Sequence, residues 1–370
     1  MGVATALSNR RAGAAATTMR AAVYRGLNDV RVETLPVPEI GKGEILVRVA
    51  ACGICGTDLK KIHTGSHSAP RIFGHEMAGT IVAVGEGVGA FSVGDRVVAL
   101  HHIPCGQCYY CRKKTYAQCE TYKRVGVTAG FEPSGGGFAE YIRVMDWIVA
   151  RGGVVRIPNA VPFEQAAFVE PVSTCLKGVK LLDLQPDETV LVIGQGPIGI
   201  LLASLAKRSG AKILTSDVYA ERHRVAGSLG LINPIDARNE DVVARVKAES
   251  EGRGADAVIL AVGADALIRT AMAAARPGGK VMLFAQTQHG EAVIDPGAIC
   301  LDEKTLLGSY SSSVDFQQEA ADIVFEGYVS GYDLTRLVSH RFGLEQAVEA
   351  IDMASNPQPN SMKIMIEPGA

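Results

Sequence analysis

The sequence has no large excess of charge of either sign. It carries 37 basic and 39 acidic residues among 370, a formal net charge of −2 at pH 7. A protein that holds nucleic acid or an anionic membrane surface electrostatically needs a basic field. The near-neutral balance therefore argues against both of these partners, and a small molecule is the expected one.

Long uninterrupted apolar runs are also missing. The most apolar stretch, residues 190–206, is broken by Gln195, Pro197 and three glycines, whereas a spanning helix needs about 20 apolar residues. We therefore expect no transmembrane span. Residues 1–18 lack the apolar core of a secretory signal, and we interpret them as a disordered leader, with a transit peptide or an upstream start codon as alternatives.

The length and pattern of the chain predict two domains, because a single core stops growing near 250–300 residues. Before about residue 173, short alternating runs such as 45–49 and 79–84 predict β structure. After it, a β-branched run at 189–194 and further strand-like runs alternate with helical stretches, which predicts parallel βαβ units and an α/β fold class. The predicted segments are a leader at 1–18, a β-rich domain at 19–172, a doubly wound parallel-sheet domain at 173–307 and a mixed segment at 308–370.

Six of the eight cysteines fall in one window, from Cys52 to Cys119. In a chain of this size without a secretory signal, such crowding indicates metal binding in a reducing cytoplasm rather than disulfides. Four of the six form a C-x2-C-x2-C-x7-C run that can close a tetrahedron around one zinc ion. An iron–sulfur cluster favours a closer fourth cysteine followed by Pro, whereas Glu120 follows here. The predicted ligands of this structural zinc are Cys105, Cys108, Cys111 and Cys119.

Other residues of metal-ligand type are scattered along the first half. Cys55 lies in 52-CGICGTD-58, His75 and Glu76 lie in 74-GHE-76, and Glu170 precedes a proline. A His beside a Glu is more often a surface pair than a ligand pair, and a C-x2-C is as often half of another zinc site. The spacing of these residues alone does not decide their role.

The run 194-GQGPIG-199 matches the dinucleotide-binding fingerprint, directly after a predicted strand and before a predicted helix. Gly194 permits the tight turn, Gly196 lets the backbone approach a pyrophosphate, and Gly199 brings helix against sheet. Amides at the helix N-terminus then bind the anion. A glycine turn in a flavodoxin-like sheet is the alternative. The predicted contacts at this turn are Gly194, Gly196, Pro197, Ile198 and Gly199.

Asp217 ends the next predicted strand, 23 residues after Gly194. Its carboxylate is expected to accept hydrogen bonds from the adenosine ribose, which favours NAD over NADP. Arg222, which we include among the cofactor-binding residues, follows closely. It could meet a phosphate, pair with Asp217 or stack on adenine, and the sequence leaves these roles open.

Taken together, 74-GHEMAGTIVAVGEGV-88, 94-GDRVV-98, the four-cysteine run and the glycine turn resemble the zinc-dependent medium-chain alcohol dehydrogenase family over residues 19–367. The segments 52-CGICGTD-58 and 170-EP-171 most resemble the polyol branch typified by sorbitol dehydrogenase, with threonine dehydrogenase second. The resemblance implies a GroES-like catalytic domain interrupted by a Rossmann domain, assembled into homodimers or homotetramers. It also implies two zinc ions per chain and oxidation of a secondary alcohol, most simply a polyol or sugar alcohol, by NAD.

Residue by residue, the resemblance implies that Cys55, His75 and Glu170 bind a catalytic zinc, with Glu76 as a nearby or exchangeable ligand. Thr57 matches the hydroxyl that takes the proton of the substrate. Many members of the family place a His five residues after the zinc-binding cysteine to pass this proton outward. In this chain that residue is Lys60, and His63 follows three residues later, so the outer proton relay is left open.

Two other functions fit parts of the pattern. A non-catalytic dinucleotide-binding protein could keep the fold and the structural zinc. Joint retention of Cys55, His75 and Glu170 disfavours it. A zinc-free quinone reductase of the same fold would lack both zinc signatures. Metal analysis giving two zinc ions per chain would exclude both.

Overall fold

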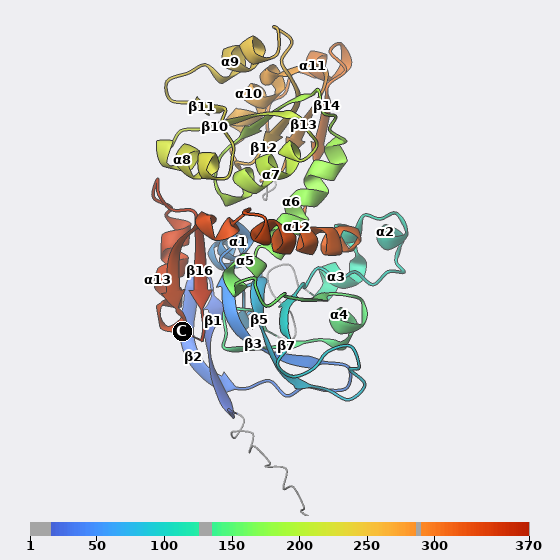
Figure 1. Ribbon diagram of the computed structural model, residues 1–370, viewed down its shortest axis with the longest axis vertical. Helices are drawn as coiled ribbons and strands as arrows, with labels where there is room; N and C mark the ends of the chain where they lie inside the picture. The colour runs from blue at the N-terminus through green and yellow to red at the C-terminus, as the bar shows by residue number, and fades with distance from the viewer. Residues whose placement is uncertain (1–15, 126–134, 286–289, 370) are drawn as a thin grey trace, which may run out of the picture.

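The computed structural model describes residues 16–125, 135–285 and 290–369. Most of the predicted leader, residues 1–15, lies outside the described residues. Figure 1 shows two lobes stacked along the long axis, with α6 (Val169–Leu182) and α12 (Gln317–Val329) where they meet. Among the described residues, no helix is long and apolar enough to cross a membrane.

The first lobe is built mostly on antiparallel strands, with β15 and β16 paired in parallel. A seven-stranded sheet has the order β15-β16-β3-β5-β6-β8, with β7 also paired to β3, and a smaller sheet has the order β2-β1-β4. The C-terminal strand β16 pairs with β3, with Met365 opposite Gly53, so residues 363–367 lie beside residues 45–53 (Figure 1). The strands are β1 (Thr18–Gly26), β2 (Asp29–Pro36), β3 (Ile45–Gly53), β4 (Arg71–Ile72), β5 (Glu76–Val84), β6 (Arg96–Ala99), β7 (Tyr141–Val144), β8 (Val154–Arg156), β15 (Val338–Gly343) and β16 (Lys363–Glu367).

The second lobe is a six-stranded parallel sheet of order β11-β10-β9-β12-β13-β14. This is the Rossmann order, in which β9 and β12 flank the point where the strand order reverses and ligands bind. The α/β fold class predicted from the sequence is confirmed. The elements of this lobe are β9 (Thr189–Ile193), α7 (Pro197–Lys207), β10 (Lys212–Asp217), α8 (Ala220–Ser228), β11 (Pro234–Asp236), α9 (Val242–Glu249), β12 (Ala255–Leu260), α10 (Ala266–Ala274), β13 (Ala275–Leu283), α11 (Pro296–Cys300) and β14 (Thr305–Gly308).

The largest apolar core runs through both lobes. It joins Val98 and Leu100 of the first lobe, through α6 and α12, to the buried face of α7. The predicted boundary between residues 172 and 173 falls inside α6, which is one continuous helix. The remaining helices are α1 (Gly56–Thr64), α2 (Tyr109–Arg112), η1 (Tyr116–Gln118), α3 (Glu120–Val125), α4 (Asp146–Ala150), α5 (Phe163–Ala166), η3 (Val314–Phe316), η4 (Leu334–Leu337), η5 (Leu344–Gln346) and α13 (Ala347–Ser355).

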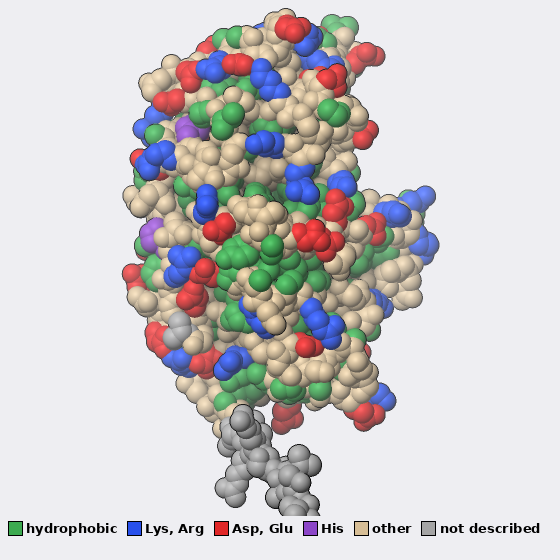
Figure 2. All heavy atoms as spheres, in the orientation of Figure 1, with side chains coloured by type: hydrophobic (Ala, Val, Ile, Leu, Met, Phe, Trp, Pro, Cys, Tyr) green, Lys and Arg blue, Asp and Glu red, His purple; other side chains and the backbone are tan. Residues whose placement is uncertain are grey.

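Charged side chains of both signs are interspersed over the face shown in Figure 2. No field of one sign dominates this face, in keeping with the formal net charge of −2. The polar groups that matter for function lie instead in the interior, where the two lobes meet.

Candidate active site

One cavity of about 260 Å³ brings residues of both lobes together. Cys55, Thr57 and His75 come from the first lobe, while Ile198 and Phe284 come from the parallel sheet and its helix α7. Glu76 and Glu170 also line it, so every residue that the resemblance assigns to the catalytic zinc and to the proton step lies in this cavity.

The first turn of α1 fixes Cys55. Cys55 is the N-cap residue of this helix, in extended conformation, and the Thr57 backbone N–H donates to its Sγ at 3.5 Å. In return, Asp58 accepts a hydrogen bond from the Cys55 backbone N–H at 3.0 Å, which completes a capping box. The cysteine is thereby held at the end of β3 with its sulfur toward the cavity.

Asp58 also fixes His75. This fully buried carboxylate lies 3.1 Å from His75 Nδ1 and accepts the Gly74 backbone N–H at 3.3 Å. Burial alone would lower the pKa of His75, but the charges of Asp58 and Cys55 outweigh it and raise this pKa well above its usual value. A carboxylate on one ring nitrogen leaves the other nitrogen available to a metal ion, which is the usual arrangement of a zinc-binding histidine.

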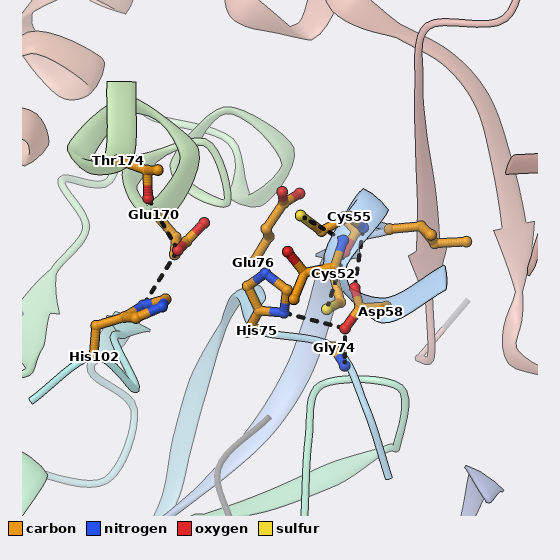
Figure 3. A network of polar contacts seen from close by, with 12 residues as sticks. Cys52, Cys55, Asp58, Gly74, His75, Glu76, His102, Glu170 and Thr174 are labelled. Atoms are coloured by element: carbon orange, nitrogen blue, oxygen red, sulfur yellow. Dashed lines mark hydrogen bonds and ion pairs between the residues drawn. The ribbon is translucent and has the colours of Figure 1, made fainter. Parts of the chain in front are cut away.

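Cys55, His75 and Glu76 form the tightest group of possible ligands in the cavity. Their ligand atoms all lie within 4.8 Å of one another, and Figure 3 shows the three side chains converging. Sulfur, imidazole and carboxylate are donors that zinc accepts, so the group fits a zinc ion. Glu76 is also engaged from its other side, by the buried Lys363 at 2.7 and 2.9 Å.

Glu170 lies in the same cavity but outside this group. Its Oε1 is 3.3 Å from His102 Nδ1 and accepts the Thr174 hydroxyl at 3.3 Å (Figure 3). Burial raises the pKa of Glu170 to about 7. The structure therefore assembles two of the three ligands that the resemblance implies, places Glu76 closest to them, and turns Glu170 toward His102.

The four cysteines of the second predicted site also converge, with ligand sulfurs within 4.8 Å of one another. Burial opposes charge on Cys105, but hydrogen bonds from the backbone N–H groups of Gln107 and Cys108 outweigh it and lower the pKa of this thiol to about 6. Burial and neighbouring thiols raise the pKa of Cys111 to about 12. Because crowded thiolates repel one another, a divalent cation fits this set.

The glycine turn has the geometry of a dinucleotide site. Gly194 has φ +95°, and a Cβ there would lie 2.2 Å from Val262; a Cβ on Gly199 would lie 1.8 Å from the Gly194 carbonyl oxygen. At Gly196, the N-cap of α7, a Cβ would meet nothing within 4 Å. Gly194 and Gly199 are thus required by the packing of the protein itself. Gly196 borders open space, where a pyrophosphate fits against the N-terminus of α7, at Pro197 and Ile198.

Asp217 lies at the end of β10, with its carboxylate beside this turn. It accepts the backbone N–H groups of Gln195 at 2.7 Å and Tyr219 at 3.0 Å, and Arg222 Nη1 lies 3.4 Å away. Of the roles left open for Arg222, pairing with Asp217 is the one that the structure contains. The guanidinium also lies over the Tyr219 ring, 4.9 Å from its centroid.

Neither Lys60 nor His63 lines the cavity. The His63 ring lies on the exposed side of α1, where its nitrogens are 2.6 Å from Asn28 Oδ1 and 2.7 Å from Ser355 Oγ. The structure therefore shows no histidine of α1 beside Thr57.

The sequence interpretation missed three polar residues of the site. Asp58 could have been found from its position three residues after Cys55, the spacing of a capping box. His102 follows a buried strand directly before the cysteine lobe, and Lys363 is the one charged residue in the run 363–366, directly before three apolar residues. His102 and Lys363 could not have been found in this way, because only the tertiary fold brings them to Glu170 and Glu76.

Two family descriptions match the chain: the alcohol dehydrogenase GroES-like domain over residues 41–158 and the zinc-binding dehydrogenase over residues 197–326. Sorbitol dehydrogenase of Bacillus subtilis is 31% identical over 356 residues, covering 95% of this chain and 97% of the relative. A zinc-binding dehydrogenase of Sinorhizobium meliloti bound to NADP has a TM-score of 0.86 at 30% identity, covering 95% of this chain and 100% of the other. An alcohol dehydrogenase of Escherichia coli CFT073 complexed with NADH has a TM-score of 0.82 at 25% identity, covering 95% and 100%.

A Cys, His and Glu group beside a dinucleotide turn defines an oxidoreductase that interconverts an alcohol and a ketone with zinc and a nicotinamide cofactor. The chain belongs to the zinc-dependent medium-chain alcohol dehydrogenase family.

Proposed function

We propose that this enzyme is an NAD-dependent polyol dehydrogenase that binds two zinc ions per chain. One observation carries the proposal: the metal-ligand group, Thr57 and the start of the dinucleotide-binding helix share one cavity. Cys55, His75 and Glu170 are the proposed ligands of the catalytic zinc, with Glu76 as the exchangeable one. The four-cysteine lobe is proposed to hold the second ion, without an open position.

When bound, a zinc ion held by these residues would supply the Lewis acid that lowers the pKa of an alcohol, and a nicotinamide cofactor would supply the hydride acceptor. The chain itself positions these groups and removes the proton. Thr57 is proposed to take the substrate proton at Oγ1 while its own hydroxyl proton passes outward to water, because it lines the cavity and lies two residues after Cys55. Ile198 and Phe284 line the side of the parallel sheet and keep water from the reacting face.

The substrate class is proposed from the sorbitol dehydrogenase relative and from the character of the cavity. Several hydroxyl-bearing residues line it, namely Thr57, Thr174, Ser309, Tyr310 and Ser311. Several hydroxyls within one cavity suit a substrate with more than one hydroxyl. Turnover should therefore be measured with polyols, sugar alcohols, simple secondary alcohols and threonine; turnover of threonine alone would move the enzyme to the threonine dehydrogenase branch.

The preference for NAD is proposed from Asp217. The relatives of known structure include one bound to NADP and one complexed with NADH, so the comparisons leave the choice open. The phosphate of NADP would meet the Asp217 carboxylate, whose side chain is 3% exposed and whose repulsion is therefore weakly screened. Arg222 already pairs with this carboxylate, which leaves it less available to a phosphate.

The test of cofactor choice is kcat/KM for both cofactors. The parent should prefer NAD by more than about tenfold, the equivalent of ~1.4 kcal/mol. Asp217→Ala should lose most of this preference, while Asp236→Ala, at the end of the neighbouring strand, serves as the control. Equal use of NAD and NADP by the parent would contradict the assignment of Asp217.

A further inference from the structure

A buried ion pair lies directly under the candidate metal site. Lys363 Nζ donates to both carboxylate oxygens of Glu76, at 2.9 and 2.7 Å, and to the Ile54 carbonyl oxygen at 3.2 Å. The side chains are 5% and 2% exposed, and the two residues are 287 positions apart in the chain. The pair therefore exists only because β16 returns to the first lobe.

Three neighbouring strands build the place where this pair lies. Gly53 of β3 is opposite Glu76 of β5 on one side and opposite Met365 of β16 on the other. A Cβ on Gly53 would lie 2.1 Å from Glu76 Oε2. The Glu76 carboxylate thus lies across the backbone of β3, where only glycine leaves room, and it reaches Lys363 from β16 there.

This placement puts one carboxylate between a buried cation and the candidate metal site. On one side Glu76 belongs to the group with Cys55 and His75 whose ligand atoms lie within 4.8 Å of one another. On the other side the ammonium of Lys363 binds both of its oxygens. Lys363 also acts electrostatically on Cys55 and Glu170, so it opposes a second positive charge in the cavity.

We propose that Lys363 is a positioning residue that competes with the catalytic zinc for Glu76, so that Glu76 stays a reserve ligand and one coordination position stays open to the substrate. This inference rests on the proposed function, because it takes Cys55 and His75 as ligands of a catalytic zinc. A buried ion pair is weak evidence for a role in stability, since well-packed apolar residues often replace such pairs at no cost. The proposed role at the metal site explains why a Glu76–Lys363 ion pair, and not an apolar pair, lies at this position.

The test compares metal binding in four full-length proteins: the parent, Lys363→Met, Glu76→Gln and the double variant. Without its competitor, Glu76 should bind the metal in Lys363→Met. The zinc dissociation constant, measured by chelator competition, should then fall by about 10- to 100-fold, the range that outer partners of metal ligands control. In the cobalt-substituted protein, the visible absorption spectrum should differ from that of the parent, because the Glu76 carboxylate enters the coordination sphere.

The double variant should return the cobalt spectrum to that of the parent, because the reserve ligand is gone. It also keeps the proposal testable if Lys363→Met folds poorly, since removing both charges leaves no unpaired buried ion. Lys304→Met is the matched control: the Lys304 side chain is 9% exposed and lies 3.3 Å from Asp302 in the parallel-sheet lobe. It should leave zinc affinity and spectrum unchanged.

Identical cobalt spectra in the parent, Lys363→Met and the double variant would overturn the proposal. So would weaker zinc binding in Lys363→Met, because that result would mean that Lys363 supports Glu76 as a ligand. Both readouts are independent of turnover. A parent that binds catalytic zinc but oxidises no polyol would instead contradict the proposed substrate class and leave this inference standing.

Discussion

Thr57 lies two residues after Cys55, in the first turn of α1, and this spacing places both residues on the wall of one cavity. A hydroxyl that accepts the substrate proton contributes about 10²- to 10⁴-fold to the rate. Thr57→Val should therefore lower kcat/KM by this factor, while zinc content and NAD affinity stay unchanged. Thr57→Ser keeps the hydroxyl and should retain most activity. Parent-like turnover in Thr57→Val would remove Thr57 from the proton step.

Asp58 supports two proposed ligands at once, through the backbone N–H of Cys55 and through His75 Nδ1. Asp58→Asn keeps the shape but removes the charge and one acceptor, so the zinc dissociation constant should rise by about 10- to 100-fold. Chelator competition measures this change. Asp95→Asn is the control, because Asp95 pairs with Arg156 at the surface of the same lobe. Equal zinc affinity in the parent and Asp58→Asn would show that Asp58 only caps α1.

At the scale of single residues, sequence reasoning predicts the metal-ligand types but not their arrangement. The cysteine spacing alone brings four sulfurs to one place, because 15 residues close a short loop. Cys55, His75 and Glu170 required the family resemblance, since nothing local relates them. The contact between Glu76 and Lys363 forms only because β16 pairs with β3, and no local sequence pattern specifies this pairing.

At the scale of elements, the parallel sheet was the easier part to predict. Its strands β9 and β12 are mostly apolar and mostly buried, and β9 matches the predicted run at 189–194 closely. By contrast, β2 is rich in charged and half-buried residues, and the sequence pattern does not predict it. It forms because β1 offers it a nearly full-length antiparallel partner.

The cysteine lobe is an element that depends on its ligands. Its own apolar cluster is small: Cys111, Cys119 and Tyr122 are the buried members, packed against Cys105, Cys108 and Tyr116. Cys119→Ser should therefore lower the melting temperature and reduce zinc by about one ion per chain, because structural zinc contributes folding free energy. Differential scanning calorimetry and metal analysis measure both effects. Cys300→Ser, at an exposed cysteine of the other lobe, is the control. Unchanged melting temperature and zinc content in Cys119→Ser would contradict the structural site.

At the scale of the whole molecule, the active site is where distant parts of the chain meet. Cys55 and His75 come from the first lobe, Glu170 from the helix between the lobes and Lys363 from the last strand. The domain pattern in the sequence indicates that the C-terminal segment differs from the parallel sheet. It does not indicate which strand this segment joins, because register is set by tertiary packing.

Gln165 connects the first lobe to the segment that follows the parallel sheet. It is fully buried in α5, donates to the carbonyl oxygens of Val324 at 2.9 Å and Tyr332 at 3.3 Å, and accepts the Leu334 backbone N–H at 2.7 Å. A single amide thus joins the first lobe to α12 and to the turn that leads into β15.

Gln165→Leu keeps the volume but leaves the Leu334 N–H and the Tyr332 carbonyl without this partner. Each unpaired buried group costs about 1–3 kcal/mol. The melting temperature of the protein should fall by several degrees, since ~1 kcal/mol corresponds to roughly 2–4 °C in a protein somewhat smaller than this one. Gln185→Leu, at an exposed glutamine, should change it little. If Gln165→Leu melts at the temperature of the parent, apolar packing alone stabilises the contact between α5 and α12, and the hydrogen bonds of the amide contribute nothing to the stability.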